Sequence, residues 1–310
     1  MIRNFRLNCI LPCLLGIALT APGCTPTGDM GALPPADQAP NQVVAQAPAL
    51  WRVADEDTTV YLFGTVHILP KGVDWFKDDI ADALASSDAL VTEIYVTEDE
   101  KPLVAKAFMT SGTLPAGENL RDMMSPDARL QYELALKKLS MPLSAFDRYE
   151  PWYAALNLSL IPLFQQGYTD RAGVESVIEA KAAGKKRIQL ESYRYQAEML
   201  DGLPFDSQLR YLASVAGDID AIVPTLDQLV LEWASGDTEG IDALMNVDYG
   251  DDVLADALFA SRNRKWAAWI DERLDTPGTV FVAVGAGHLA GDKSVQAVLA
   301  QRGIKTVRLQ

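Results

Sequence analysis

Two histidines stand in the same local pattern, and the chain of 310 residues contains only these 2. His67 ends the segment 61–67, in which a hydrophobic run is followed by a glycine, two residues and the histidine. His288 ends the segment 280–288 in the same way. Imidazole is a common ligand of transition metals and a common carrier of protons near neutral pH. The repeated G-x-x-H pattern therefore predicts that both histidines belong to one site.

Two acidic residues stand where a predicted strand ends. Glu93 closes the strand 89–93, and Glu191 follows the short strand 188–190. Because a buried charge without a partner is costly, such acids are candidates for function. We predict Glu93 as a metal ligand or general base and Glu191 as its support. A structural alternative is that both acids form ion pairs with the arginines of the segment 262–264.

The chemistry that fits these residue types is hydrolysis by a metal-activated water. His67, His288 and Glu93 form a predicted ligand set for a divalent metal, which we expect to be manganese, cobalt or zinc. Such a metal lowers the pKa of a bound water and polarises a carbonyl group. Arg262 and Asn263 are predicted to bind a substrate carboxylate or a developing oxyanion. The structural alternative for the two histidines is that both are core residues with satisfied hydrogen bonds. The structural alternative for Arg262 and Asn263 is that they belong to a solvated helix face.

Each histidine segment belongs to a strand, turn, helix and strand unit, and the two units bracket the chain. The first unit ends with the strand 89–93 and the second with the strand 304–309. Gly64, Gly285 and Gly287 at the strand ends allow close backbone approaches that a side chain would block. If the two leading strands are neighbours, both imidazoles emerge at the carboxyl edge of one sheet, where open α/β folds place their ligands.

These units predict an α/β fold with a central sheet and a large helical insertion. Segment 50–53 and segment 58–63 form a predicted hairpin around the polar turn 55–57. Residues 98–168 have helical spacing, and so do residues 194–275. We therefore expect one folded domain over residues 49–310, with the helical insertion over about residues 98–168 covering one side of the sheet.

The first residues predict export. Basic residues precede the apolar run 10–19, which is too short to span a membrane and typical of a signal peptide over residues 1–23. Cys24 follows in a pattern like a bacterial lipobox, which predicts a lipid on that cysteine; plain cleavage near Ala21 is the alternative. Residues 24–48 are rich in Pro and Ala and predict a flexible tether.

Composition excludes several partners and cofactors. The net charge of −15 and the absence of a basic run argue against nucleic acid. The segment 285–291 is a loosened dinucleotide fingerprint, but the chain ends after the next strand, so a nucleotide is not expected. Of the 3 cysteines, two lie in the signal segment and the third is Cys24, so the mature domain is expected to have no disulfide.

Six motifs in chain order resemble the TraB/GumN family, and the resemblance covers residues 50–310. They are the hairpin of 50–53 with 61–67, then 91–93, 173–175, 184–185 with 190–192, 262–266 and 284–291. The family is grouped with the TIKI metalloproteases and, more distantly, with the erythromycin esterase and ChaN-like proteins. The resemblance implies an α/β fold and a metal-dependent hydrolase site at His67 and His288. It also implies Glu93 and Glu191 as site acids and Arg262 and Asn263 as polar partners.

These observations predict a membrane-tethered, metal-dependent hydrolase of the bacterial envelope that acts on a peptide or protein substrate. We expect it in the periplasm, anchored by lipid and favouring the outer membrane. The alternative function is a lipoprotein without catalysis that binds or sequesters a peptide or protein partner, with its helical insertion forming the groove.

Overall fold

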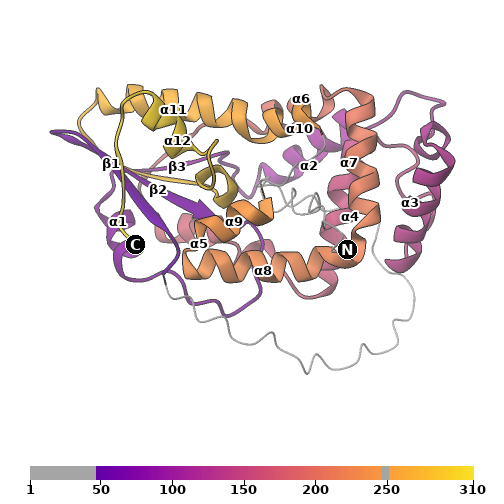
Figure 1. Cartoon of the computed structure of the whole chain (residues 1–310), viewed down its shortest axis with the longest axis horizontal. Coiled ribbons are helices and arrows are strands. Elements are labelled where there is room, and N and C mark those ends of the chain that lie inside the picture. The colour runs from indigo at the N-terminus through magenta and orange to yellow at the C-terminus, as the bar shows by residue number, and fades with distance from the viewer. Residues whose placement is uncertain (1–46, 246–250) are drawn as a thin grey trace.

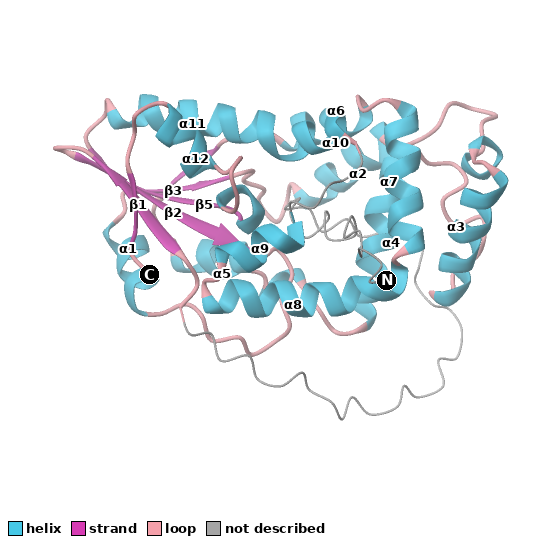
Figure 2. Cartoon of the chain, viewed as in Figure 1, coloured by secondary structure: helices cyan, strands magenta, loops and turns pink. Residues whose placement is uncertain are grey.

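A mixed sheet of six strands forms the centre of the computed structural model, which describes residues 47–245 and 251–310. The strands lie in the order β4-β3-β5-β2-β1-β6. Figure 2 shows the sheet with helices packed around it. Four neighbours, β4, β3, β5 and β2, are parallel, and β1 pairs antiparallel with β2 and with β6. The strands are β1 (Leu50–Ala54), β2 (Thr58–Thr65), β3 (Ala89–Thr92), β4 (Lys186–Gln189), β5 (Gly278–Gly285) and β6 (Thr306–Arg308).

The two strands that lead to the histidines are direct neighbours, as the sequence predicts. β2 pairs with β5 in parallel over its whole length, and Thr65 stands opposite Gly285. The predicted hairpin of β1 and β2 is also confirmed. At its turn the Asp55 carboxylate accepts a hydrogen bond of 2.8 Å from the backbone N–H of Thr58. The register therefore brings both G-x-x-H turns to one edge of the sheet.

Helices cover both faces of the sheet (Figure 1). On one face, α11 (Ser261–Leu274) and α12 (Val295–Gln301) pack Trp266, Ile270 and Leu299 against the apolar side chains of the strands. The other face packs against α1 (Asp78–Ser86), α5 (Val174–Lys181) and α8 (Ile222–Ser235). There the rings of Phe63 and Trp233 meet at 6.4 Å between centroids. Because both faces are covered, the inner strands β2, β3 and β5 contain continuous hydrophobic runs.

The remaining helices build a second layer beyond the carboxyl edge of the sheet (Figure 1). At its centre α4 is apolar on all sides, and almost every one of its side chains is buried against neighbouring helices. The Ser125 side chain caps α3, whose first residue is proline. These helices are α2 (Lys101–Ser111), α3 (Pro126–Lys138), α4 (Pro151–Gln165), α6 (Tyr193–Asp201), α7 (Phe205–Gly217), α9 (Thr238–Met245) and α10 (Asp252–Ala255).

The α/β fold class with a large helical portion is thus confirmed. The predicted signal peptide, Cys24 and all but the last two residues of the tether lie outside the described residues. Within residues 47–245 and 251–310, no helix combines the length and the apolar character that crossing a bilayer requires.

Two glycines permit the close approaches that bring the histidine turns into place. A side chain on Gly64 would have its Cβ 3.1 Å from the Cα of Ala286, in the turn that carries the second histidine. A Cβ on Gly173 would lie 1.9 Å from the backbone oxygen of His67. The next residue, Val174, donates a backbone hydrogen bond of 3.0 Å to Val66. Gly173 therefore lets the start of α5 pack directly against the first histidine turn.

Replacing Gly173 with alanine is expected to destabilise the domain and displace His67. The obstacle is backbone, which cannot rotate away, so we expect a loss of about 1–3 kcal/mol or more in the free energy of unfolding. The matched control is Gly217→Ala at the end of α7, where an added Cβ meets nothing within 4 Å. That change is expected to leave stability equal or up to about 1 kcal/mol higher. Urea denaturation measures both; equal stability of the two variants would contradict the prediction.

Candidate functional site

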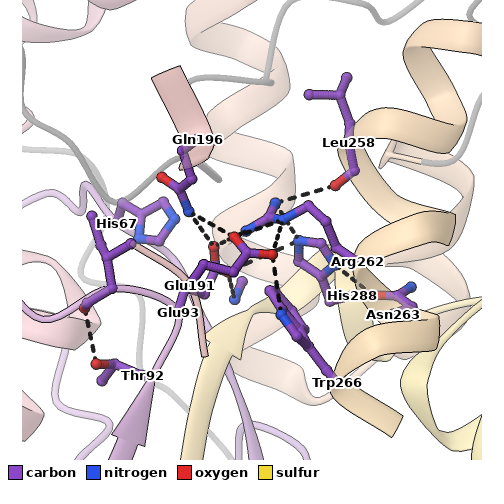
Figure 3. Close-up of polar contacts among 12 residues, drawn as sticks. His67, Thr92, Glu93, Glu191, Gln196, Leu258, Arg262, Asn263, Trp266 and His288 are labelled. Atoms are coloured by element: carbon purple, nitrogen blue, oxygen red, sulfur yellow. Dashed lines mark hydrogen bonds and ion pairs between the residues drawn. The ribbon is translucent and has the colours of Figure 1, made fainter. Parts of the chain in front are cut away.

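The predicted site residues gather where the parallel strands end. His67 follows β2, Glu93 follows β3, Glu191 follows β4, and His288 lies in the short 3-10 helix Ala286–Leu289 after β5. Figure 3 shows these side chains pointing toward one another. The carboxyl edge of the parallel strands is therefore where the polar groups converge, as in other open α/β sheets.

Arg262 of α11 occupies the middle of this group and is 1% exposed. Its guanidinium donates a hydrogen bond of 2.5 Å to Glu93 and bonds of 2.9 and 3.0 Å to the two oxygens of Glu191. It also donates to the backbone oxygen of Leu258, 3.1 Å away in a π-helical turn that precedes α11. Both glutamates thus form the ion pairs that the sequence left open as a structural alternative, and Arg262 is their shared partner.

The charges of this group hold Arg262 firmly in its cationic form. Burial alone would lower the pKa of Arg262, but the charges and hydrogen bonds of Glu93 and Glu191 outweigh it and raise that pKa. Because the guanidinium is committed to these two acids deep in the protein, it does not point into the cavity. The predicted role of Arg262 as a donor to a substrate oxyanion therefore has no support in this arrangement.

His288 is a fully buried, neutral part of the same network. Burial, then the charges of Arg262 and His67, place the pKa of His288 well below its usual value. Its Nε2 lies 3.1 Å from Arg262 and so accepts the hydrogen bond, while Nδ1 lies 2.6 Å from Oδ1 of Asn263 and donates. Asn263 in turn donates to the backbone oxygen of Lys293 at 2.8 Å, which fixes its amide. The ring of Trp266 packs on the imidazole with centroids 4.4 Å apart.

His67 has a different partner, Glu175 of the first turn of α5. Nδ1 of His67 lies 2.5 Å from Oε1 of Glu175, and His67 is 9% exposed. Burial would raise the pKa of Glu175, but the charge of His67 and the nearby Thr65 hydroxyl lower it overall. Glu175 therefore stays a carboxylate beside the imidazole. This pair has the geometry of a histidine base and the acid that orients it.

A cavity of about 440 Å³ opens onto this pair. His67, Glu93 and Glu175 line it, together with apolar side chains such as Val104 and Leu160 from the helical layer. Glu191, Arg262 and His288 do not line it. The predicted site is thus divided into an outer group that faces the cavity and an inner group that is sealed behind Glu93.

The glycines that were predicted to support the site provide a backbone hydrogen-bond donor and room for close packing. The N–H of Gly285 donates a hydrogen bond of 2.7 Å to Oε1 of Glu93, which fixes that carboxylate. A Cβ on Gly287 would lie 2.7 Å from the end of the Met245 side chain and 3.1 Å from the ring of Phe259. These glycines let the second histidine turn pack closely against its neighbours.

The predicted metal ligands do not form a ligand set. Nε2 of His288 lies 3.9 Å from Oε1 of Glu93, and the Arg262 guanidinium donates to both residues. Metal ions in proteins usually take three or more protein ligands. In the part of the chain that the structure describes, no group of three or more His, Cys, Asp or Glu side chains is placed to hold a metal ion. As arranged, these residues do not fit a resident metal, because a guanidinium already occupies the position between the acids.

Two residues of the site were not predicted. The sequence analysis included Glu175 only as part of the motif 173–175. Its position in the first turn of a helix that follows a glycine is the signal that could have identified it. Gln196 of α6 was not noticed; its Nε2 donates to Glu191 at 3.2 Å and to Glu93 at 3.5 Å. A glutamine one helical turn past a capping serine has no pattern that marks it from the sequence alone.

Comparisons with known proteins find a family whose sequences match this chain. A sequence model of the TraB/PrgY/gumN family matches residues 49–308. An uncharacterized protein of Treponema pallidum (strain Nichols) is 25% identical over 267 residues, which are 81% of this chain and 80% of that protein. Human metalloprotease TIKI1 is 34% identical over 97 residues, which are 30% of this chain and 18% of that protein. No solved structure is significantly similar.

Arg262→Met is expected to lower the free energy of unfolding by about 3–5 kcal/mol, because it leaves two buried carboxylates without their cation. Arg264→Met is the matched control on the same helix. Arg264 is 58% exposed and pairs with Asp256 on the surface, so its loss is expected to cost less than about 1 kcal/mol. Chemical denaturation of both variants gives the comparison. A small effect of Arg262→Met would show that the acids do not depend on this arginine.

Proposed function

The chain belongs to the TraB/PrgY/gumN family, and from that starting point we propose that it is a hydrolase that acts on peptide bonds. The observation that carries the proposal is the His67–Glu175 pair, which faces a cavity large enough for part of a peptide. The partial similarity to a protein named as a metalloprotease supports the same class of reaction.

His67 is the general base in this proposal. It takes a proton from a water molecule as the water oxygen bonds to the substrate carbonyl carbon. The Glu175 carboxylate, 2.5 Å from Nδ1, fixes the orientation of the imidazole and stabilises the imidazolium that forms. His67 then passes the proton to the leaving amine as the carbon–nitrogen bond breaks. The products are a carboxylic acid and an amine, and the acid then gives the second proton of the water to the amine or to solvent.

The inner group supports this chemistry without taking part in it. Arg262 and the Gly285 N–H hold the two oxygens of Glu93, so the acid presents a fixed negative edge to the cavity. Glu191, Asn263 and His288 keep Arg262 in place. We therefore assign these three predicted site residues to positioning.

The sequence also predicts a divalent metal, either manganese, cobalt or zinc. Support for it lies in the partial similarity to the metalloprotease. The donors of the described residues do not fit such an ion while Arg262 stands between them, so no step of the proposed mechanism uses one.

Variants of the pair test the proposal. We expect His67→Gln and Glu175→Gln to lower kcat for peptide hydrolysis by about 10²–10⁴-fold, because each removes part of the general base. The matched control is Glu179→Gln, an acid on the same helix that also lines the cavity. It is expected to change kcat less than about threefold. Product formation from a peptide mixture, followed by mass spectrometry with and without a chelator, is the measurement.

The same assay distinguishes hydrolysis from the second candidate function, which is peptide binding without cleavage. The apolar wall that α2 and α4 contribute to the cavity also suits a protein that binds a peptide without cleaving it. If no peptide is cleaved with or without added manganese, cobalt or zinc, while peptide binding survives chelation, the protein is a binder. Turnover that persists in His67→Gln would instead reject His67 as the base.

We also propose that the protein is exported and held at the membrane by a lipid on Cys24, with residues 24–48 as a tether. The basic residues, the short apolar run and the cysteine support this proposal. Cys24→Ser is expected to move the protein from the membrane fraction to the soluble periplasmic fraction. Fractionation followed by immunoblotting measures this. A wild-type protein already in the soluble fraction would point to plain cleavage near Ala21.

A further inference from the structure

Phe164, near the end of α4, is exposed although most of its helix is buried. Its side chain is 41% exposed, and it lines the same cavity as His67 and Glu175. Leu160 lies one helical turn earlier on the same face of α4, also lines the cavity and is 4% exposed. The apolar stripe of α4 therefore runs from the interior of the cavity toward solvent, and Phe164 is its outer end.

The helices α2 and α4 give the cavity an apolar side. They contribute Val104, Leu160 and Phe164 to its wall. The fourth side chain that they contribute, Lys101, already forms an ion pair of 2.6 Å with Glu98. A substrate that contacts these two helices therefore meets apolar surface and no unpaired charge, whereas the histidine and its carboxylate partner come from β2 and α5.

The packing of the core does not account for a phenylalanine at position 164. Its ring lies outside both buried clusters that hold the sheet and the helices together. Single exposed apolar side chains are ordinary on protein surfaces. Among the exposed large apolar side chains of residues 47–245 and 251–310, however, only Phe164 lines this cavity. Its position points to contact with whatever enters the cavity.

We propose that Phe164 determines specificity by covering a bulky apolar side chain of the substrate, such as leucine or phenylalanine, next to the bond that is hydrolysed. This inference rests on the proposed hydrolytic function. Such a side chain would lie between Phe164 and the deeper surface of Val104 and Leu160 and would release water from all of them. A charged side chain there would lose its hydration without gaining a partner.

The size of the cavity agrees with this substrate. Its volume of about 440 Å³ lies in the range of pockets that enclose small ligands. Because one cavity of this size contains both Phe164 and His67, a single substrate residue and its neighbouring peptide bond can contact both. The helical layer therefore selects the residue, and the strand ends carry out the reaction.

Phe164→Ala tests the assignment with two peptides that differ only in having leucine or alanine next to the cleaved bond. We expect KM for the leucine peptide to rise about tenfold with kcat within about threefold, because the lost contact serves substrate and transition state alike. KM for the alanine peptide is expected to stay within about twofold. The matched control is Leu134→Ala on α3, which removes a side chain of similar exposure, 42%, outside the cavity and is expected to change neither constant.

Stability separates this role from a structural one. Neither Phe164 nor Leu134 belongs to the buried clusters, so both variants are expected to keep the urea midpoint of the wild type. A Phe164→Ala variant that loses stability and keeps its KM for the leucine peptide would make Phe164 a packing residue and overturn the inference.

Capture of peptides by the His67→Gln variant gives a readout that does not depend on catalysis. The immobilised protein is incubated with a digest of denatured casein, and mass spectrometry identifies the retained peptides. We expect peptides with leucine or phenylalanine to be enriched about tenfold over the digest. Adding Phe164→Ala is expected to abolish this enrichment, and adding Leu134→Ala is expected to preserve it.

The outcomes distinguish the two proposals. No enrichment, or equal enrichment with and without Phe164, overturns the inference and leaves the hydrolase proposal standing. If the wild type cleaves no peptide while the enrichment depends on Phe164, the hydrolase proposal fails and the apolar subsite remains.

Discussion

One buried arginine holds the site together. Arg262 joins the end of β3, the segment after β4 and the turn after β5 by direct hydrogen bonds to Glu93, Glu191 and His288. Without that cation, two carboxylates would face each other in the low-dielectric interior, where like charges and poor solvation are both costly. The position of Arg262 depends on α11 and the π-helical turn before it, so the strand ends can keep their geometry only while this helix is packed on the sheet.

The two G-x-x-H turns have the same sequence pattern but different environments. His288 is enclosed by Trp266 and Asn263 and stays neutral beside a guanidinium. His67 lies against a carboxylate at the wall of a cavity. Reactivity depends on these surroundings rather than on the motif, since charge and burial decide which imidazole can take a proton. The second turn therefore serves to hold the inner group.

The sequence was sufficient for those parts of the structure that depend on local pattern. Hydrophobic runs that end in glycine identified β2 and β5, and their similarity indicated that they are neighbours. The convergence of His67, Glu93, Glu191 and His288 followed from the rule that parallel strands end at one edge. Pairing between distant segments could not be derived in the same way. Arg262 reaches Glu93 across 169 positions, and no local spacing encodes which of several arginines does so.

The charges of Glu93 and of the inner group behind it favour a base at His67. Glu93, Glu191 and Arg262 together carry one surplus negative formal charge, because His288 is neutral. With Glu175 on the other side, a proton arriving on His67 meets attraction from both directions. A divalent ion between Glu93 and His288 would instead lie against the guanidinium and be repelled by it. Metal binding at that position would require Arg262 to withdraw, and its bonds to both glutamates oppose that movement.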